Sequence, residues 1–362
     1  MKKSHIAVAA MAALAVVGTA QAQSSVTLFG NIDVGVRNVK NKGEDAITSL
    51  TKNSISSSAL GFRGVEDLGG GLKAGFHLEG DLDPDTGTAS GLQFQRRSTI
   101  SLSGGFGEIR LGRDFVPTFT VHTKYDPFGT NGLGSSINVF GTVAGAVTSS
   151  AARANNGLAY FGTFGDFNIN LQHNLRESAS GSGDYSGLRV GYNAGPLSVD
   201  VATGSEVCQR DTASSPTATT GASLLNTCGL KNPRRSNIGA SYDLGFVKPM
   251  VQYNTAKLDL AGTEVKTTNI LIGLTAPVGP GTLRFSYVVT DLKVGTDLGD
   301  AKQIAVGYTY PLSKRTSISA NVARISADDS FLSNTSGANS VLPDRLDIKE
   351  RTGYELAVRH TF

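Results

Sequence analysis

The sequence predicts an all-β protein, a sixteen-stranded antiparallel β-barrel that crosses a membrane. Three observations carry this prediction. Apolar and polar residues alternate along many segments with a period of two, which is the period of a β-strand. The connectors between these segments are alternately short and long. Glycine supplies 44 of the 362 residues, and charged residues are only 17% of the chain, where about 25% is usual in a soluble protein.

The composition excludes several other classes of protein. A collagen needs glycine at every third position, and a disulfide scaffold needs far more than the two cysteines present. Intrinsic disorder accompanies low apolar content and high net charge, whereas this chain has 39% hydrophobic residues and a formal net charge of +3. Binding to nucleic acid is not favoured, because no clustered basic face stands out.

Residues 1–22 have the pattern of a secretory signal peptide. A lysine pair near the start precedes a short apolar segment at residues 6–18, and Ala-Gln-Ala at residues 20–22 is a small-x-small cleavage site. We therefore expect one exported domain over residues 23–362. Cleavage removes two of the 33 basic residues and leaves all 30 acidic ones, so the mature chain is almost neutral. No later stretch approaches the roughly 20 apolar residues of a membrane-spanning helix.

The first and last predicted strands show the alternation most clearly. Residues 26–36 place valine, leucine and isoleucine at even positions, and residues 354–362 place mostly apolar side chains at even positions, with Glu355 and Arg359 between them. An apolar face beside a charged face suits a strand with lipid outside and water inside. The same alternation recurs at residues 73–81, 97–102, 270–275, 284–289 and 303–308.

The connectors predict which end of the barrel is which. Short ones with glycine or proline lie at residues 67–71, 104–107, 195–196, 244–246, 277–281 and 311–315. Long ones lie at residues 39–57, 115–152, 207–233 and 327–350. Outer-membrane barrels have short periplasmic turns and longer outer loops. Pairing strands with connectors gives about sixteen strands of roughly ten residues, enough to enclose an aqueous channel.

A soluble β-sandwich is the alternative fold. It fits less well, because many strands follow one another in a single meander and the last one ends on Phe362 without a tail. No long helix is expected in either fold, only a short helical turn within residues 115–152.

Four segments resemble the trimeric general-diffusion porins of β-proteobacterial outer membranes, a Gram-negative porin family. They are residues 23–30 (QSSVTLFG), 61–74 (GFRGVEDLGGGLKA), 106–113 (FGEIRLGR) and 359–362 (RHTF). The resemblance implies a homotrimer of sixteen-stranded barrels in the outer membrane, surrounded by lipid and lipopolysaccharide. It implies passive diffusion of ions and small hydrophilic solutes, with no enzymatic activity. It also implies that Phe362 is read by the barrel-insertion machinery, although an interfacial aromatic anchor explains this residue equally.

The connector at residues 115–152 is the expected constriction loop. It is the longest connector in the first half of the chain, it is rich in glycine, and a loop of this length is either disordered or functional. Tyr125, Phe128 and Phe140 are the aromatic residues that would pack it against the inside of the barrel. An exposed mobile loop is the alternative. In the related porins the third loop folds inward and narrows the pore.

Charges at the constriction would set the selectivity of such a pore, because a narrow aqueous gap strengthens their action on a passing ion. The candidates for a basic wall are Arg63, Arg96, Arg97 and Arg153. The candidates for an acidic side are Glu79, Asp114, Asp126 and Asp33. In the porins that this chain resembles, arginines form a ladder that Arg96 and Arg153 match best, while Ala59 stands where close relatives have another arginine. We therefore expect weak anion preference; each charge taken alone is equally a solvated residue of the lumen.

The remaining signals are weaker. Cys208 and Cys228 lie in a predicted outer loop, where an oxidising compartment favours a disulfide over two free thiols. Neither His-x-x-x-His nor Cys-x-x-Cys occurs, so no metal or cofactor is expected. Two other functions stay open. A hydrolase carried on a barrel needs only one serine and one histidine in contact, and a surface adhesion protein would show no conductance.

Overall fold

The computed structural model describes residues 25–87, 93–144, 152–176, 184–206, 230–260, 263–328 and 350–362. The signal peptide expected at residues 1–22 lies outside this part of the chain. Cys208 and Cys228 lie outside it as well, so their pairing stays a prediction.

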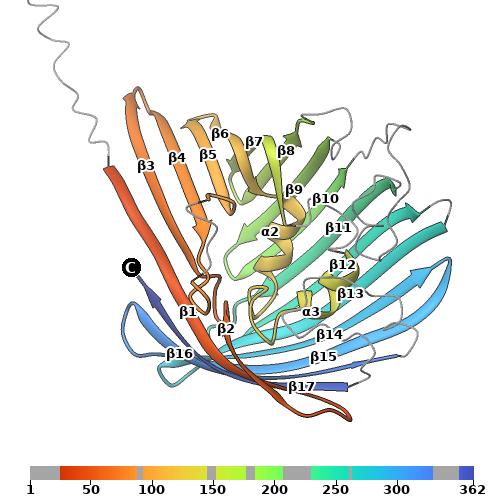
Figure 1. Cartoon of the computed structure of the whole chain (residues 1–362). Coiled ribbons are helices and arrows are strands. Elements are labelled where there is room, and N and C mark those ends of the chain that lie inside the picture. The colour runs from red at the N-terminus through yellow and green to blue at the C-terminus, as the bar shows by residue number, and fades with distance from the viewer. Residues whose placement is uncertain are drawn as a thin grey trace, which may run out of the picture.

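The described residues form one antiparallel sheet that closes on itself around a central space (Figure 1). Its strands are β1 (Ser25–Asn41), β2 (Ile47–Lys52), β3 (Ala59–Gly69), β4 (Leu72–Asp81), β5 (Arg97–Gly104), β6 (Gly107–Phe115), β7 (Arg153–Phe164), β8 (Phe167–Asn174), β9 (Tyr185–Ala194), β10 (Leu197–Glu206), β11 (Leu230–Tyr242), β12 (Lys248–Leu260), β13 (Thr263–Val278), β14 (Gly281–Val294), β15 (Thr296–Pro311), β16 (Thr316–Ala327) and β17 (Glu350–Thr361).

The barrel closes where β1 pairs with β17, from Asn31 opposite Thr361 to Asn41 opposite Arg351. β2 and β3 share one position around the barrel, because β2 pairs with residues 34–39 of β1 and β3 pairs with residues 25–31 of the same strand. They are two halves of one broken strand. The barrel therefore has sixteen strand positions, which confirms the predicted fold class.

The predicted alternation of connectors is confirmed at most positions, with three differences. Only residues 261–262 separate β12 from β13, at the end where longer connectors were expected. Val39 pairs with Ile47, so most of residues 39–57, expected as a long loop, is a hairpin that extends the sheet. Gly295 alone joins β14 to β15, at the end of the barrel where longer connectors were expected. Its φ of +67° is accessible to glycine without strain.

Two helices lie inside the ring of strands, α2 (Pro117–Lys124) and α3 (Ile137–Ala144) (Figure 1). The sequence predicted only one short helical turn here. Pro117 begins α2, where its fixed φ suits the first helical turn and its missing N–H costs no hydrogen bond. In the part of the chain that the structure describes, no helix is long and apolar enough to span a membrane.

The hydrophobic core lies between the inner wall and the chain that carries these helices. Val139 of α3 packs against Leu271, Val288 and Leu292 of the wall. The outer surface, by contrast, exposes large apolar side chains; Leu356 is 66% exposed. Alternation along each strand therefore separates an apolar outer face from an inner face that is mostly polar, as predicted.

Candidate functional site

The expected constriction loop folds into the barrel, as predicted. We call residues 116–144, the described part beyond β6, the inward loop. Its helix α2 contacts β8 to β11, and α3 contacts β13 to β15. The inward loop therefore lines one side of the channel and narrows it.

Side-chain amides on the wall hold the backbone of the inward loop. Gln252, Gln303 and Asn237 donate hydrogen bonds to loop carbonyls at 2.7–3.0 Å, and the two glutamines each bind two consecutive carbonyls. All three side chains are buried. A carbonyl at a helix end has no partner within the helix. The wall supplies that partner to the last turn of α2.

A buried carboxylate on β10 fixes the end of α2. Asp200 is fully buried and accepts hydrogen bonds from the hydroxyl of Tyr125 at 2.6 Å and from Nζ of Lys124 at 2.5 Å. Arg189 on the neighbouring strand donates to its other oxygen at 2.7 Å. Charge-assisted hydrogen bonds of this kind are the strong ones. Sequence reasoning missed Asp200, although it is the only charge near the middle of its strand.

A second buried carboxylate organises the inward loop itself. Asp126 accepts hydrogen bonds from the backbone N–H of Phe128 at 2.8 Å and from the hydroxyl and N–H of Ser136 at 2.7 and 3.0 Å. It is only 4% exposed. Asp126 was expected as an acidic charge facing the pore, but it binds the loop from within.

Ser136 also contacts His122, whose Nε2 lies 2.7 Å from the serine oxygen. Burial, assisted by the positive charge of Arg235, lowers the pKa of His122 to about 3, so its imidazole is neutral. Because Ser136 donates to Asp126, we assign the histidine N–H as the donor to Ser136. In this orientation His122 cannot accept the serine proton as a general base.

A second expected pore acid, Asp33, also has a structural role. Asp33 on β1 is fully buried and accepts hydrogen bonds from the backbone N–H groups of Ser54, Ile55 and Ser56 at 2.7–3.0 Å. These residues form the break between β2 and β3. The carboxylate thus accepts the hydrogen bonds of backbone N–H groups that have no partner strand at the break.

The other two expected acids lie beside the arginines instead of opposite them. Arg96 donates to Glu79 at 2.5 Å and to Asp81 at 2.8 Å. Nε of Arg97 lies 3.4 Å from an oxygen of Asp114. The described residues therefore place both signs of charge on one stretch of wall, β4 to β7, which we call the charged wall. The expected arrangement, with arginines on one side of the pore and acidic residues on the other, is not found for Glu79 and Asp114.

Arg110 is a member of the charged wall that sequence reasoning missed. It donates to Asp114 at 2.6 Å and to both oxygens of Glu108 at 3.0 Å each. The signal was available, because Arg110 and Glu108 are two residues apart on β6 and so share its inner face.

Arg153 differs from these paired arginines. Its guanidinium lies 4.2 Å from the centre of the Phe115 ring, and it forms no ion pair with any residue that the structure describes. Its Nε is buried without a hydrogen-bond partner. Arg63 also has no acidic partner among the described residues; it is exposed and lies 5.0 Å from the ring of Phe29.

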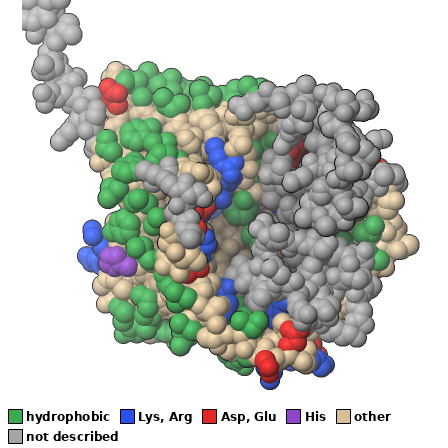
Figure 2. Space-filling model, viewed as in Figure 1, with side chains coloured by type: hydrophobic (Ala, Val, Ile, Leu, Met, Phe, Trp, Pro, Cys, Tyr) green, Lys and Arg blue, Asp and Glu red, His purple; other side chains and the backbone are tan. Residues whose placement is uncertain are grey.

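Figure 2 shows basic and acidic side chains together along the hollow at the centre of the molecule, with hydrophobic side chains over the outer surface. Within the described residues, no group of histidine, cysteine and acidic side chains is arranged to hold a metal ion. The arrangement can attract or repel passing ions.

The family model for Gram-negative porins matches residues 7–330. The chain is 39% identical to outer membrane porin protein 32 of Delftia acidovorans over the full length of both chains. It is 28% identical to an outer membrane porin protein of Bordetella pertussis, over 88% of this chain and 93% of that one. Among solved structures, it resembles the anion-selective porin from Comamonas acidovorans with a TM-score of 0.80 and 35% identity, over 94% of this chain and all of the other.

Proposed function

The chain belongs to the Gram-negative porin family and forms a channel in the bacterial outer membrane; from this premise we propose that the channel weakly prefers anions. The observation that carries the proposal is the unequal pairing on the charged wall. Arg96, Arg97 and Arg110 each lie beside a carboxylate, whereas Arg153 has none among the described residues.

The paired arginines contribute little net field, because the carboxylate beside each one offsets its charge. Arg153 keeps its full charge and stands where the chain returns from the inward loop to the wall. Low-dielectric walls focus the field of such a charge on the water between them. Arg113 on the same wall also forms no ion pair among the described residues, because it donates to the carbonyl of Gln95 and to the side chain of Asn155. A few uncompensated arginines among several ion pairs support a weak preference. The name of the similar Comamonas acidovorans structure, an anion-selective porin, supports its sign.

Reversal potentials across a planar bilayer with a salt gradient test this proposal. We expect the sign of an anion-selective channel, and a cation-selective sign would refute it. Glu79→Gln is the informative partner variant, because it removes one of the two carboxylates beside Arg96 and should increase anion preference. Lys314→Gln, in the turn at the far end of the barrel, is the control and should change nothing.

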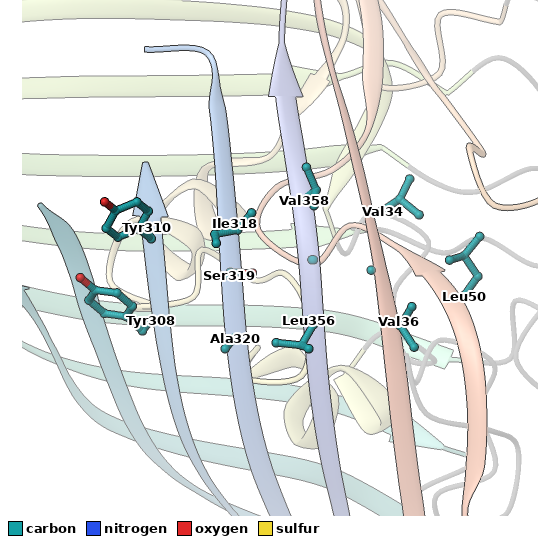
Figure 3. A pocket seen from close by; sticks show the side chains of 12 residues that line it. Val34, Val36, Leu50, Tyr308, Tyr310, Ile318, Ser319, Ala320, Leu356 and Val358 are labelled. Carbon is teal, nitrogen blue, oxygen red and sulfur yellow. The ribbon is translucent and has the colours of Figure 1, made fainter. Parts of the chain in front are cut away.

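We also propose that three barrels assemble through the outer face around the seam, which is the place where β1 pairs with β17 and closes the barrel. An apolar groove of about 600 Å³ opens on the outer face there, lined from β1, β2 and β15 to β17 (Figure 3). Its lining includes the side chains of Val36, Tyr310, Leu356 and Val358. A neighbouring barrel can fill such a groove, and conductance in steps of three would support the trimer.

A matched pair of variants separates assembly from folding. Leu356→Arg places a charge in the groove, and Ile272→Arg places the same charge on the outer face of β13, where the side chain is 57% exposed. We expect monomers in detergent from the first variant and trimers from the second. Trimers from both would contradict this location of the interface.

The position of Phe362 supports a role for this residue in assembly. Its N–H donates to the carbonyl of Gly30 at 3.0 Å, and the N–H of Gly30 donates back at 3.2 Å. Its ring lies so close to Gly30 that a Cβ atom there would clash at 2.7 Å. We propose that this residue is read during insertion as well as closing the seam. Deleting Phe362 should lower the yield of assembled barrel, and an unchanged yield would refute the role.

A catalytic function gains no support from the serine–histidine contact. Ser136 and His122 are buried beneath the loop surface, and the hydroxyl donates to Asp126 rather than to the imidazole. We therefore propose a passive channel without enzymatic activity. Conductance without lipid hydrolysis by the purified protein is the expected result.

A further inference from the structure

Four basic side chains form an unbroken row across β11 to β14. Arg234 stands opposite Lys257, Lys257 opposite Lys266, and Lys266 opposite Lys293. Each neighbour in this row is the directly paired residue of the next strand. We call these four residues the basic row.

The basic row lies on the outer face of the barrel. Lys257 alternates in phase with Val251 and Tyr253, which are exposed, and Lys266 is in phase with the exposed Ile270. The row is close to the loop end, since Lys293 is one residue before the end of β14. The turns at residues 243–247 and 279–280 are at the opposite, periplasmic end. The row therefore borders the outer leaflet of the outer membrane.

Like charges placed directly opposite each other on a sheet are destabilising. Lys293 is partly compensated by Asp297, whose carboxylate lies 3.4 Å from its Nζ. Among the described residues, no ion pair is formed by Arg234, Lys257 or Lys266.

Acidic side chains do flank the row. Asp259 stands opposite Glu264 in the strand register, two residues nearer the loops than the row. Asp291 lies two residues nearer the periplasm than Lys293. These acids limit the net charge of the region. They do not interrupt the row, whose four cations remain adjacent to one another.

We propose that the basic row binds the phosphate groups of lipopolysaccharide in the outer leaflet. Neighbouring strands are about 4.8 Å apart, so the row spans about 14 Å, enough for more than one phosphate of a single head group. Ile270 lies four residues below Lys266, about 13 Å along the strand. A lipid whose phosphates lie at the row would thus lay its acyl chains over the apolar outer band. The proposal concerns a lipid partner, and it is independent of the ion preference of the pore.

The test uses the assembled protein in detergent and bisphosphorylated lipid A as the probe. We expect Lys257→Gln with Lys266→Gln to weaken lipid A binding about 30-fold, since two interfacial cations are removed. The charge-preserving pair Lys257→Arg with Lys266→Arg should keep the binding. Lys314→Gln is the matched control at the periplasmic end and should bind as the unmodified protein does.

The proposal would be overturned by unchanged binding of the double glutamine variant, by an equal loss in the Lys314 control, or by displacement of lipid A by millimolar inorganic phosphate. An identical loss for phosphatidylglycerol would also overturn it, because the row would then recognise any anionic surface. The single-channel conductance of the double variant should equal that of the unmodified protein, which shows that the barrel has folded.

Discussion

The two sides of the channel share the same alternation of apolar and polar side chains, but their inward polar side chains have different partners. On the side that holds the inward loop, the wall presents neutral amides and buried carboxylates, and several of these groups bind the loop. On the charged wall, β4 to β7, the polar groups are ionised and bind mainly one another. We propose that one side fixes the width of the pore and that the other sets its electrostatic field. The inner face of the barrel is therefore polar on both sides, although the side chains that act on passing ions need lie on only one of them.

Breaking the anchor at Asp200 should have the largest effect. Asp200→Ala leaves Lys124 and Arg189 without their carboxylate, and removing one partner of a buried ion pair costs about 3–5 kcal/mol. We expect a lower unfolding temperature and a larger, noisier conductance as the loop leaves the wall. Glu108→Ala on the charged wall is the comparison, and it should leave the conductance noise unchanged. Equal effects of Asp200→Ala and Glu108→Ala on the conductance noise would contradict the proposed difference between the two sides.

Removing a single amide should have a smaller effect of the same kind. Gln252→Leu removes the donor to the carbonyl of His122 and one of the two donors to the carbonyl of Val121, at a cost of about 1–3 kcal/mol. Hydrogen exchange of the loop amides should become faster, with little change in the strands. Protection equal to that of the unmodified protein would show that the amide does not hold the loop.

Acid should loosen the loop without affecting the strands to the same degree. The pKa of His122 lies near the ordinary value of 6.5 when the side chain is exposed, and it falls to about 3 in the folded loop. The depressed pKa makes the neutral form part of the fold, so its contribution is complete above pH 6.5 and is lost as the pH falls toward 3, by up to about 1.4 kcal/mol per pH unit. His122→Gln should remove this part of the pH dependence of loop exchange; an unchanged slope would contradict the assignment.

The sequence predicted the barrel well because alternation and connector length are local properties. Residues 26–36 and 354–362 each show the period of two, and the structure pairs them across the seam. The inward loop was predicted from its length and its glycines. Its two helices were not, because their stability comes from wall residues far away in the chain, such as Gln252.

The partners of the charges could not be predicted from the sequence. Asp33 shares a strand face with other polar residues, and nothing local shows that β2 and β3 break beside it. Arg96 precedes β5, so strand alternation does not fix its direction; it meets Glu79 because of the register between β4 and β5. Pairing across strands decides which charges stay free, and a single strand does not contain that information.

The reversal potential of Arg153→Gln tests the central claim most directly, namely that an uncompensated charge on one side sets the ion preference while the other side sets the width. We expect the anion-to-cation permeability ratio to fall toward one at nearly unchanged conductance, because the charge is lost and the loop stays in place. An anion preference equal to that of the unmodified channel would contradict the account.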